Sequence, residues 1–361
     1  MRKFFLIILS LFILSCNDPV FYSISMEELP LNPRISGPST NFAELNNKMY
    51  VAAKKRIYRY DNGEWTDFTV SGRITHLAAT TSKLYALMEN RIILFSEEEM
   101  TEEITIPLED KKIQGIYASE DILFIGTSNA EIYYLNAGET TPLPIAGGDF
   151  SMLCGVASDA DNYYLCNKDS NGIFLVPKAA PETAALIANS TEKEFTNIIN
   201  LNADSIAAMS RQGSLFKVTP EGVNEIVKFS DNRRATSALC VWTSGTWDDN
   251  VWTKGTNTLL LVGRQDLTNS ISTGYTHGYV EIEFNPETGE LIGERFNEPG
   301  RTSISSISEN TNEHYASSIG KRGINYFYQA PNGILFASLN HGVWSYRAHR
   351  NDSKRTWNAE E

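Results

Sequence analysis

The sequence has few of the residues on which metal sites and many active sites depend. Its 361 residues include five histidines and four cysteines, and no two histidines stand at the HExxH or HxH spacing of a zinc site. It also lacks a GxSxG motif, a P-loop, an EF-hand loop and a GxGxxG run before a helix. The sequence therefore predicts no metal, no cofactor and no catalytic residue.

Basic residues and long apolar runs are also scarce. Thirty-one Lys and Arg residues stand against 44 Asp and Glu residues, a net charge of −13. Such a chain repels phosphate backbones, so nucleic acid is excluded as a partner, and the composition gives no polybasic patch for anionic lipid. No segment is apolar for the roughly 20 residues that a membrane-spanning helix needs.

The N-terminus has the layout of a secretory signal peptide. Arg2 and Lys3 precede an apolar stretch that continues to Leu14, and Ser15 and Cys16 follow it. A small residue directly before a cysteine, after branched apolar residues, resembles the lipobox of bacterial lipoproteins. The resemblance implies cleavage after residue 15 and a lipid on Cys16 that anchors the chain to a membrane of the cell envelope, facing the periplasm or the surface. An ordinary signal peptide with a chance cysteine is the alternative.

The rest of the chain repeats one pattern of short apolar runs separated by polar turns. Residues 40–60 read TNFAEL-NN-KMYVAA-KK-RIYRY, and residues 324–347 read INYFYQA-PNG-ILFASL-NHG-VWSYR. A weaker fourth run follows each copy. The copies begin at residues 40, 74, 113, 152, 195, 236 and 324, so only the interval before the last one departs from a spacing of about 40 residues.

Repeats of this length with four short strands are typical of a β-propeller. One blade cannot bury both faces of its sheet, and a closed ring of blades removes exposed sheet edges. The sequence therefore predicts an all-β fold, a seven-bladed β-propeller with four antiparallel strands per blade, over residues 40–361. A proline-rich tether over residues 16–39 would join it to the lipid. A pair of β-sandwiches or a solenoid is the alternative.

Two short segments of the repeats resemble a known class of proteins. The runs RIYRYDNGEWTDF and GVWSYR resemble the sensor propellers fused to some bacterial two-component regulators. That resemblance implies the fold and a binding role. The chain lacks the regular acidic-plus-tryptophan blade motif of quinoprotein-type propellers.

The sixth copy is stretched by insertions, which are candidates for binding. Because strands alternate in direction, the insertions over residues 264–278 and 297–323 should open on one face, and that over residues 243–257 on the other. Long loops on a rigid scaffold often carry function, and aromatic and arginine side chains are the usual anchors. Passive elaboration is the alternative. The candidate binding residues are Tyr275, His277, Arg301, His314 and Tyr315, with Trp247 and Trp252 in the third insertion.

The cysteines of the fourth copy suggest a covalent link. Cys154 and Cys166 lie on its first and second strands, and their mean position falls at the centre of the turn over residues 159–161. In a symmetric hairpin they would face each other, at a Cβ separation of about 4.5–5.5 Å, close to that of a disulfide. They are candidates for a disulfide, and Cys240 is expected to be a small core residue.

Taken together, these features favour a binding or scaffold protein of the cell envelope that holds a partner protein or a glycan. The alternative is an envelope enzyme, a lyase or hydrolase of exported polymers, with its site at the mouth of the propeller channel. Such an enzyme would need His76, His277, Arg301, His314 and Tyr315 to converge. Fold alone does not decide between the two.

Overall fold

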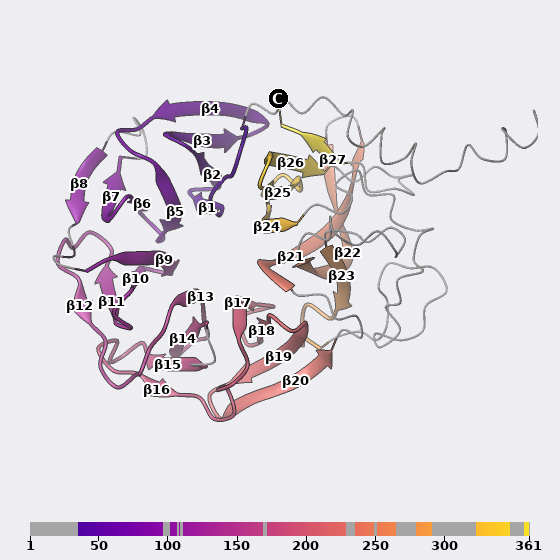
Figure 1. The fold of residues 1–361 in the computed structure, drawn as a ribbon. Coiled ribbons are helices and arrows are strands. Elements are labelled where there is room, and N and C mark those ends of the chain that lie inside the picture. Colours follow the sequence, from indigo (N-terminus) through magenta and orange to yellow (C-terminus); the bar gives the residue numbers. More distant parts are fainter. Residues whose placement is uncertain are drawn as a thin grey trace, which may run out of the picture.

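The computed structural model describes residues 35–96, 102–106, 108, 111–168, 172–228, 235–248, 251–264, 279–290, 323–346 and 357–360. These residues form seven antiparallel sheets arranged radially around a central axis (Figure 1). The predicted seven-bladed β-propeller is therefore confirmed.

Each blade is built from one continuous segment of the chain, and its strands run in order from the axis to the rim. Blades 1 to 3 consist of β1 (Ala43–Leu45), β2 (Lys48–Ala53), β3 (Arg56–Asp61) and β4 (Glu64–Thr69); β5 (Ile74–Ala79), β6 (Leu84–Met88), β7 (Arg91–Phe95) and β8 (Glu102–Ile106); and β9 (Ile113–Ser119), β10 (Ile122–Thr127), β11 (Ile132–Asn136) and β12 (Leu143–Pro144). Blades 4 and 5 consist of β13 (Leu153–Ser158), β14 (Asn162–Asn167), β15 (Ile173–Pro177) and β16 (Ala185–Leu186); and β17 (Phe195–Asn200), β18 (Ile206–Ser210), β19 (Ser214–Thr219) and β20 (Gly222–Lys228). Blades 6 and 7 consist of β21 (Ala235–Asp248), β22 (Val251–Arg264) and β23 (Tyr279–Phe284); and β24 (Ile324–Gln329), β25 (Leu335–Leu339), β26 (Gly342–Tyr346) and β27 (Trp357–Ala359).

The position of a strand in its blade decides its burial pattern. The second strands β6, β10 and β18 are buried at every residue, because neighbouring blades cover both faces of the sheet. The rim strand β4 has no buried residue, and β12 and β16 are two residues long. An unbroken apolar run therefore marks the second strand of a repeat, and weak patterning marks the fourth.

Blade 6 departs from the sequence prediction in one respect. Residues 243–257 were expected to form a loop, but β21 and β22 are 14 residues each and continue as a hairpin in which Trp247 pairs with Trp252. Thr, Trp and Val residues are frequent in this segment, and these residue types favour a strand. The fourth strand predicted over residues 291–296 lies outside the described residues.

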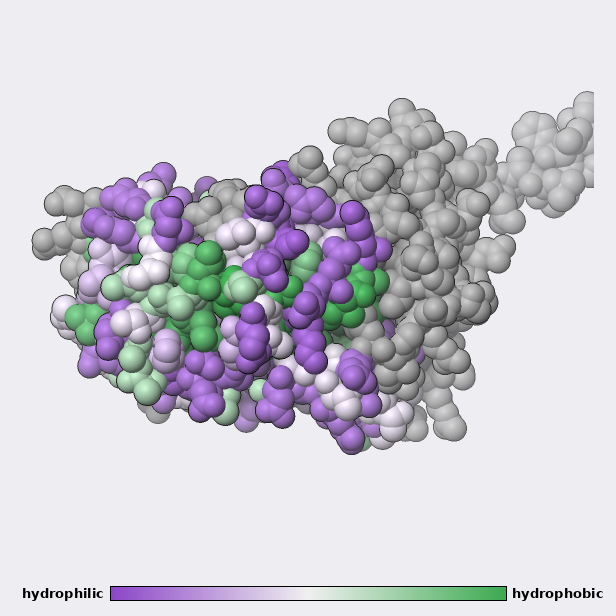
Figure 2. All heavy atoms as spheres, turned by 90° about the horizontal axis from the view of Figure 1, so that it is seen from below, coloured by the Kyte–Doolittle hydropathy of each residue, from purple (hydrophilic) through white to green (hydrophobic). Residues whose placement is uncertain are grey.

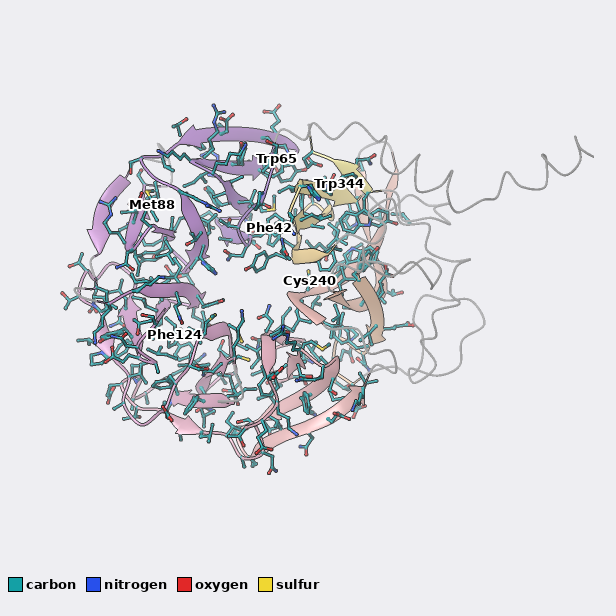
Figure 3. All side chains as sticks on the ribbon, viewed as in Figure 1. Phe42, Trp65, Met88, Phe124, Cys240 and Trp344 are labelled. Carbon is teal, nitrogen blue, oxygen red and sulfur yellow. The ribbon has the colours of Figure 1, made fainter. Side chains whose placement is uncertain are left out.

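The ring closes between blades 7 and 1 without a shared sheet. Ile35 is fully buried there, and its carbonyl oxygen accepts a hydrogen bond of 3.4 Å from the Val343 amide. Residues 35–39 of the predicted tether thus belong to the ring. Phe336 of blade 7 packs against Tyr60 and Trp65 of blade 1, with ring centroids 4.9 Å and 5.7 Å away. Trp65 and Trp344 lie on either side of this seam in Figure 3. Aromatic packing therefore holds the two ends of the ring together.

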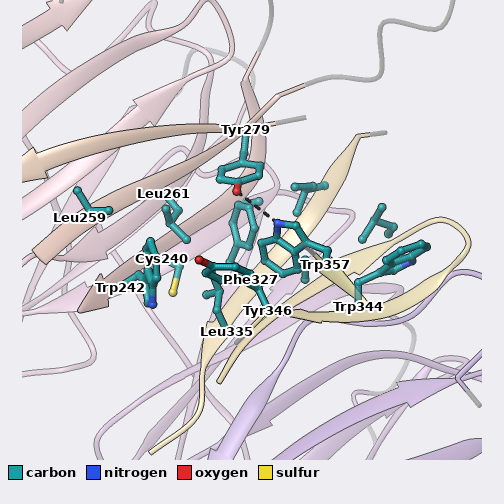
Figure 4. Close-up of a cluster of buried hydrophobic side chains, with 14 residues drawn as sticks. Cys240, Trp242, Leu259, Leu261, Tyr279, Phe327, Leu335, Trp344, Tyr346 and Trp357 are labelled. Carbon is teal, nitrogen blue, oxygen red and sulfur yellow. Dashed lines mark hydrogen bonds between the residues drawn. The ribbon is translucent and has the colours of Figure 1, made fainter. Parts of the chain in front are cut away.

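A second aromatic cluster joins blade 7 to blade 6 (Figure 4). The Trp357 indole N–H donates to the Tyr279 hydroxyl over 3.3 Å, and Phe327 packs edge-on against Tyr279 at 5.4 Å. Tyr346 contacts both Trp357 and Trp242. Blade 7 is therefore fixed by aromatic side chains on both sides.

Side-chain amides also bind neighbouring inner strands together. Gln329 of blade 7 donates to the Thr243 carbonyl oxygen over 2.8 Å and accepts from the Thr243 amide over 2.9 Å. Asn41 of blade 1 makes the same double contact with Leu77 of blade 2, at 2.6 Å and 3.0 Å. Each amide thus replaces a missing pair of ladder hydrogen bonds between two sheets. A further bridge of this kind joins Asn200 to Ser158.

Part of the rim, over blades 4 and 5, is more apolar than the edges of the two faces beside it. Figure 2 views the ring edge-on from below, with hydrophilic residues along both faces and an apolar area between them on the rim. β16 and β20 form this part of the rim in Figure 1, and Leu186 and Ile226 are exposed there by 47% and 39%. Any polar interaction surface is therefore expected on a face.

Candidate binding faces and channel mouth

The two faces differ in the turns that they carry. Ser36 pairs with the first residue of β26 and Ser39 with the last residue of β2, so the chain reaches the ring at the ends of these strands. We call this the proximal face; it holds the turns between second and third strands and the connections between blades. The distal face holds the turns between first and second and between third and fourth strands.

The short turns between second and third strands gather on one face. Six turns join second to third strands and lie on the proximal face, beginning at Lys54, Glu89, Ser128, Lys168, Arg211 and Asn340. Residues 265–278 and 297–322, which make up all but one residue of each of the other two insertions, lie outside the described residues. The same holds for Tyr275, His277, Arg301, His314 and Tyr315, whose binding role stays a prediction.

Charge is divided unequally between the faces. The described distal turns hold two lysines, Lys83 and Lys178, and ten acidic residues: Glu120, Asp121, Glu139, Asp159, Asp161, Glu182, Asp204, Glu221, Glu287 and Glu290. The described proximal turns hold five acidic residues, Glu89, Glu131, Asp149, Glu192 and Glu194, and eight basic ones: Lys54, Lys55, Arg73, Lys111, Lys112, Lys168, Lys193 and Arg211. The distal turns therefore carry a net charge of −8 and the proximal turns +3 (2 − 10 and 8 − 5). The overall charge of the chain conceals this separation.

Some distal charges are held in place by neighbouring blades. Lys178 of blade 4 forms an ion pair with Glu120 of blade 3 and lies 5.2 Å from the centroid of the Tyr163 ring. Burial, and then the charge of Glu120, raises the pKa of Tyr163 to about 12. Burial acts to raise the pKa of Asp159, but hydrogen bonds from Tyr164 and from the Asp161 and Asn162 amides outweigh it and lower that pKa. Glu120 and Asp159 are thus held in place on the acidic distal face.

A β-bulge recurs where the inner strands begin, at the proximal mouth of the channel. In each case two residues of the inner strand oppose one residue of the second strand. Bulges bend a strand and redirect its side chains, and they are frequent beside functional sites. The extra residues are Thr75, Gln114, Cys154, Thr196 and Asn325.

Two side chains at these bulges, one on the extra residue of β9 and one directly after the extra residue of β5, have a polar atom without a partner among the described residues. These atoms are Nδ1 of His76 and Oε1 of Gln114, on the adjacent inner strands β5 and β9. Burial, and then the positive charge of Lys168, lowers the pKa of His76 to about 4. The imidazole is therefore neutral at physiological pH. A water or a small polar ligand is expected to satisfy the two atoms.

Tyr117 stands next to this pair. Its ring centroid lies 6.2 Å from that of His76. Burial, and then interaction with Tyr326 and the Cys154 and Cys166 thiols, raises its pKa well above the usual value. Tyr326 belongs to blade 7 and Tyr117 to blade 3, so this interaction crosses the channel. The mouth is thus lined by neutral side chains that can donate or accept hydrogen bonds.

One tryptophan of the blade 6 hairpin, Trp252, packs against blade 7. A methyl group on Gly333, in the turn between β24 and β25, would lie 2.2 Å from Cδ2 and Cε2 of Trp252. The Trp252 indole therefore lies flat against Gly333 and is half-buried. Val251 beside it is 65% exposed. Trp252 anchors the hairpin to blade 7, and its predicted binding role, like that of Trp247, stays a prediction.

The cysteine pair differs in register from the prediction. Cys154 was expected opposite Cys166, but Gly155 takes that position because Cys154 is the extra residue of the bulge. The two sulfur atoms nevertheless lie 3.5 Å apart, and both residues are free thiols here. Cys240 is buried, as expected of a core residue.

The described part of the chain contains neither a metal-binding cluster nor a membrane-spanning helix. No group of three or more His, Cys, Asp or Glu residues there could hold a metal ion. No helix there is long and apolar enough to cross a membrane.

Comparisons with known proteins support the fold. No protein-family model and no curated protein sequence match the chain. Solved structures do: a chain of the mitotic checkpoint complex, at 11% identity and a TM-score of 0.57, covers 86% of this chain and 89% of its own. YCF48 from Cyanidioschyzon merolae matches at 12% identity and a TM-score of 0.56, over 89% of this chain and 98% of YCF48. Virginiamycin B lyase from Staphylococcus aureus matches at 12% identity and a TM-score of 0.55, over 85% of this chain and 93% of the lyase. At these identities the likeness establishes the propeller fold alone.

Proposed function

We propose that this chain is a lipoprotein of the cell envelope, anchored through Cys16, whose propeller is a non-catalytic scaffold for a partner protein or a glycan. The observation that carries the proposal is the separation of charge between the two faces of a rigid ring. The amide bridges and aromatic seams fix the blades, so the charged turns are presented in a constant arrangement. Preorganised surfaces of this kind lose little entropy on binding.

The distal face is the better docking surface for a protein. It lies opposite the face at which the chain reaches the ring, so a tether from Cys16 would leave it open. Its fixed carboxylates favour a partner with a basic surface, because complementary charge steers encounter and suppresses wrong partners. YCF48 has been solved with a bound D1 peptide, and this precedent within the fold is compatible with a protein partner.

A pull-down with charge variants tests this proposal. The full chain is used as bait for its own membrane fraction, and captured proteins are identified by mass spectrometry. The distal variant replaces Asp204 by Asn and both Glu182 and Glu221 by Gln. It should capture less partner at low salt, because the association rate falls roughly tenfold. A matched control replaces Lys54, Lys55 and Arg211 on the proximal face by Gln. A capture that is lost in the control and kept in the distal variant would refute docking on the distal face.

The channel mouth supports the enzyme as a second candidate. Neutral His76 can accept a proton, and the unpaired Gln114 oxygen beside it can hold a substrate hydroxyl or amide. A lyase or hydrolase of exported polymers would use these groups. A His76→Gln variant that stays folded should then lose turnover on such polymers while partner capture is unchanged. Equal turnover in both proteins would exclude this candidate.

A further inference from the structure

The Cys154 and Cys166 thiols form a close and isolated pair. Cys154 lies on β13 and Cys166 on β14, their sulfur atoms are 3.5 Å apart, and they are 3% and 0% exposed. Cys154 also contacts the Phe195 carbonyl oxygen of blade 5, at 3.7 Å. Cys240 on β21 instead contacts its neighbouring backbone, the Val241 carbonyl oxygen at 3.4 Å. Two of the three described cysteines are thus placed for reaction with each other.

The repeated bulge explains this placement. At the start of β13 two residues, Cys154 and Gly155, stand opposite Cys166, and a Cβ on Gly155 would lie 2.4 Å from Oδ1 of Asn197 in blade 5, so only a glycine fits beside the bulged cysteine. The Cys154 thiol therefore reaches Cys166 although the backbone register is shifted by one residue. In blades 2, 3, 5 and 7 the same bulge carries Thr, Gln, Thr or Asn, so the thiol pair is specific to blade 4.

We infer that Cys154 and Cys166 form an intramolecular disulfide that staples the first two strands of blade 4 at the channel mouth. A disulfide needs sulfur atoms about 2.05 Å apart, so closing the bond requires an approach of about 1.5 Å, which side-chain rotation can supply. In cells the inference rests on the proposed export, because envelope compartments are oxidising.

The bond forms by thiol–disulfide exchange with an oxidised dithiol donor. One cysteine thiolate attacks the donor disulfide and forms a mixed disulfide, and the second thiolate then displaces the donor's remaining sulfur. The chain loses two thiol protons and two electrons, and the donor is reduced to two thiols. Burial, and then the hydrogen bond with Cys154, holds the pKa of Cys166 well above its usual value, so little thiolate forms in the closed ring. Exchange is therefore expected during folding, before the neighbouring blades cover the pair.

Peptide mapping tests the staple directly. The full chain is refolded in a glutathione redox buffer or in excess reductant, then denatured and alkylated. Cleavage before aspartate separates the two cysteines at Asp159 and Asp161 and places them in the peptides 149–158 and 161–168. We expect these peptides linked and two fewer alkyl groups per chain after refolding in the redox buffer, with Cys240 alkylated in both samples. Alkylated Cys154 and Cys166 in the chain from the redox buffer would overturn the inference.

Two variants make the result specific. Cys240→Ala should keep the linked peptides, whereas Cys166→Ser should abolish them. The thermal midpoint of the wild-type chain should rise on oxidation by roughly 5 °C or more, and that of Cys166→Ser should not move. The experiment uses purified protein, so it gives the same answer whether or not the proposed export is correct.

Discussion

Truncation of Phe336 to alanine should weaken the ring at its seam. Phe336 is fully buried on β25 and packs against Phe42, Tyr60 and Trp65, three residues of blade 1. Removal of a buried phenylalanine ring costs about 3–5 kcal/mol, from lost transfer free energy and from the cavity left behind. At this junction the chain does not run from one blade to the next, so the cost falls on the contacts that close the ring.

A matched truncation separates seam from core. Phe124→Ala in blade 3 removes an equally buried ring that contacts Tyr163 of blade 4 at 5.2 Å, where the chain runs continuously from one blade to the next. Urea unfolding followed by tryptophan fluorescence should show a similar loss of stability in both variants. Limited proteolysis below the midpoint should cut only the Phe336 variant near the seam. A loss below about 1 kcal/mol, or the same cleavage pattern in both variants, would refute the reasoning.

Three further outcomes follow from contacts described above. The pKa of His76 is lowered from 6.5 to about 4 in the folded chain, so the free energy of unfolding should be highest above pH 6.5 and fall by about 3 kcal/mol as the pH drops to 4. Urea midpoints at several pH values measure this fall, and His76→Gln should remove the part of it that His76 causes. Gln329→Ala leaves the Thr243 amide and carbonyl unpaired and should cost about 1–3 kcal/mol, whereas substitution of the exposed Thr256 should change the free energy of unfolding little. Cys16→Ala should abolish lipid labelling and flotation with membranes, and a variant that still floats would contradict the lipobox.

The fold could be predicted because the same pattern of four short strands recurs in every copy of the repeat. Each second strand is a run of apolar residues such as Leu84–Met88, and each is bounded by turn residues at similar spacing. The prediction was wrong where the local sequence departs from the repeat. Residues 243–257 were expected to form a loop, although their Thr, Trp and Val residues have strand propensity.

The binding faces were only partly predictable. Strand alternation assigned each turn to a face, and the same assignment applied to Asp and Lys residues would have revealed the separation of charge. The bulges were not predicted, because each lies within the first two or three residues of an inner strand, a stretch too short for a change in the apolar alternation to stand out. They were decisive for Cys154, Gln114 and the neutral His76 at the channel mouth.

Because every blade is a continuous segment, most contacts in the ring join residues within about 40 positions of each other. Contacts at the seam are different: the indole N–H of Trp65 donates to the Glu360 carboxylate across 295 positions. Closing a loop of that length costs about 2 kcal/mol more entropy than closing one of 40 residues. The propeller is therefore expected to form vectorially, blade upon blade as the chain emerges, with a late and slow closing step. Until the last blade docks, the apolar flank of blade 1 that packs against blade 7 stays exposed to solvent.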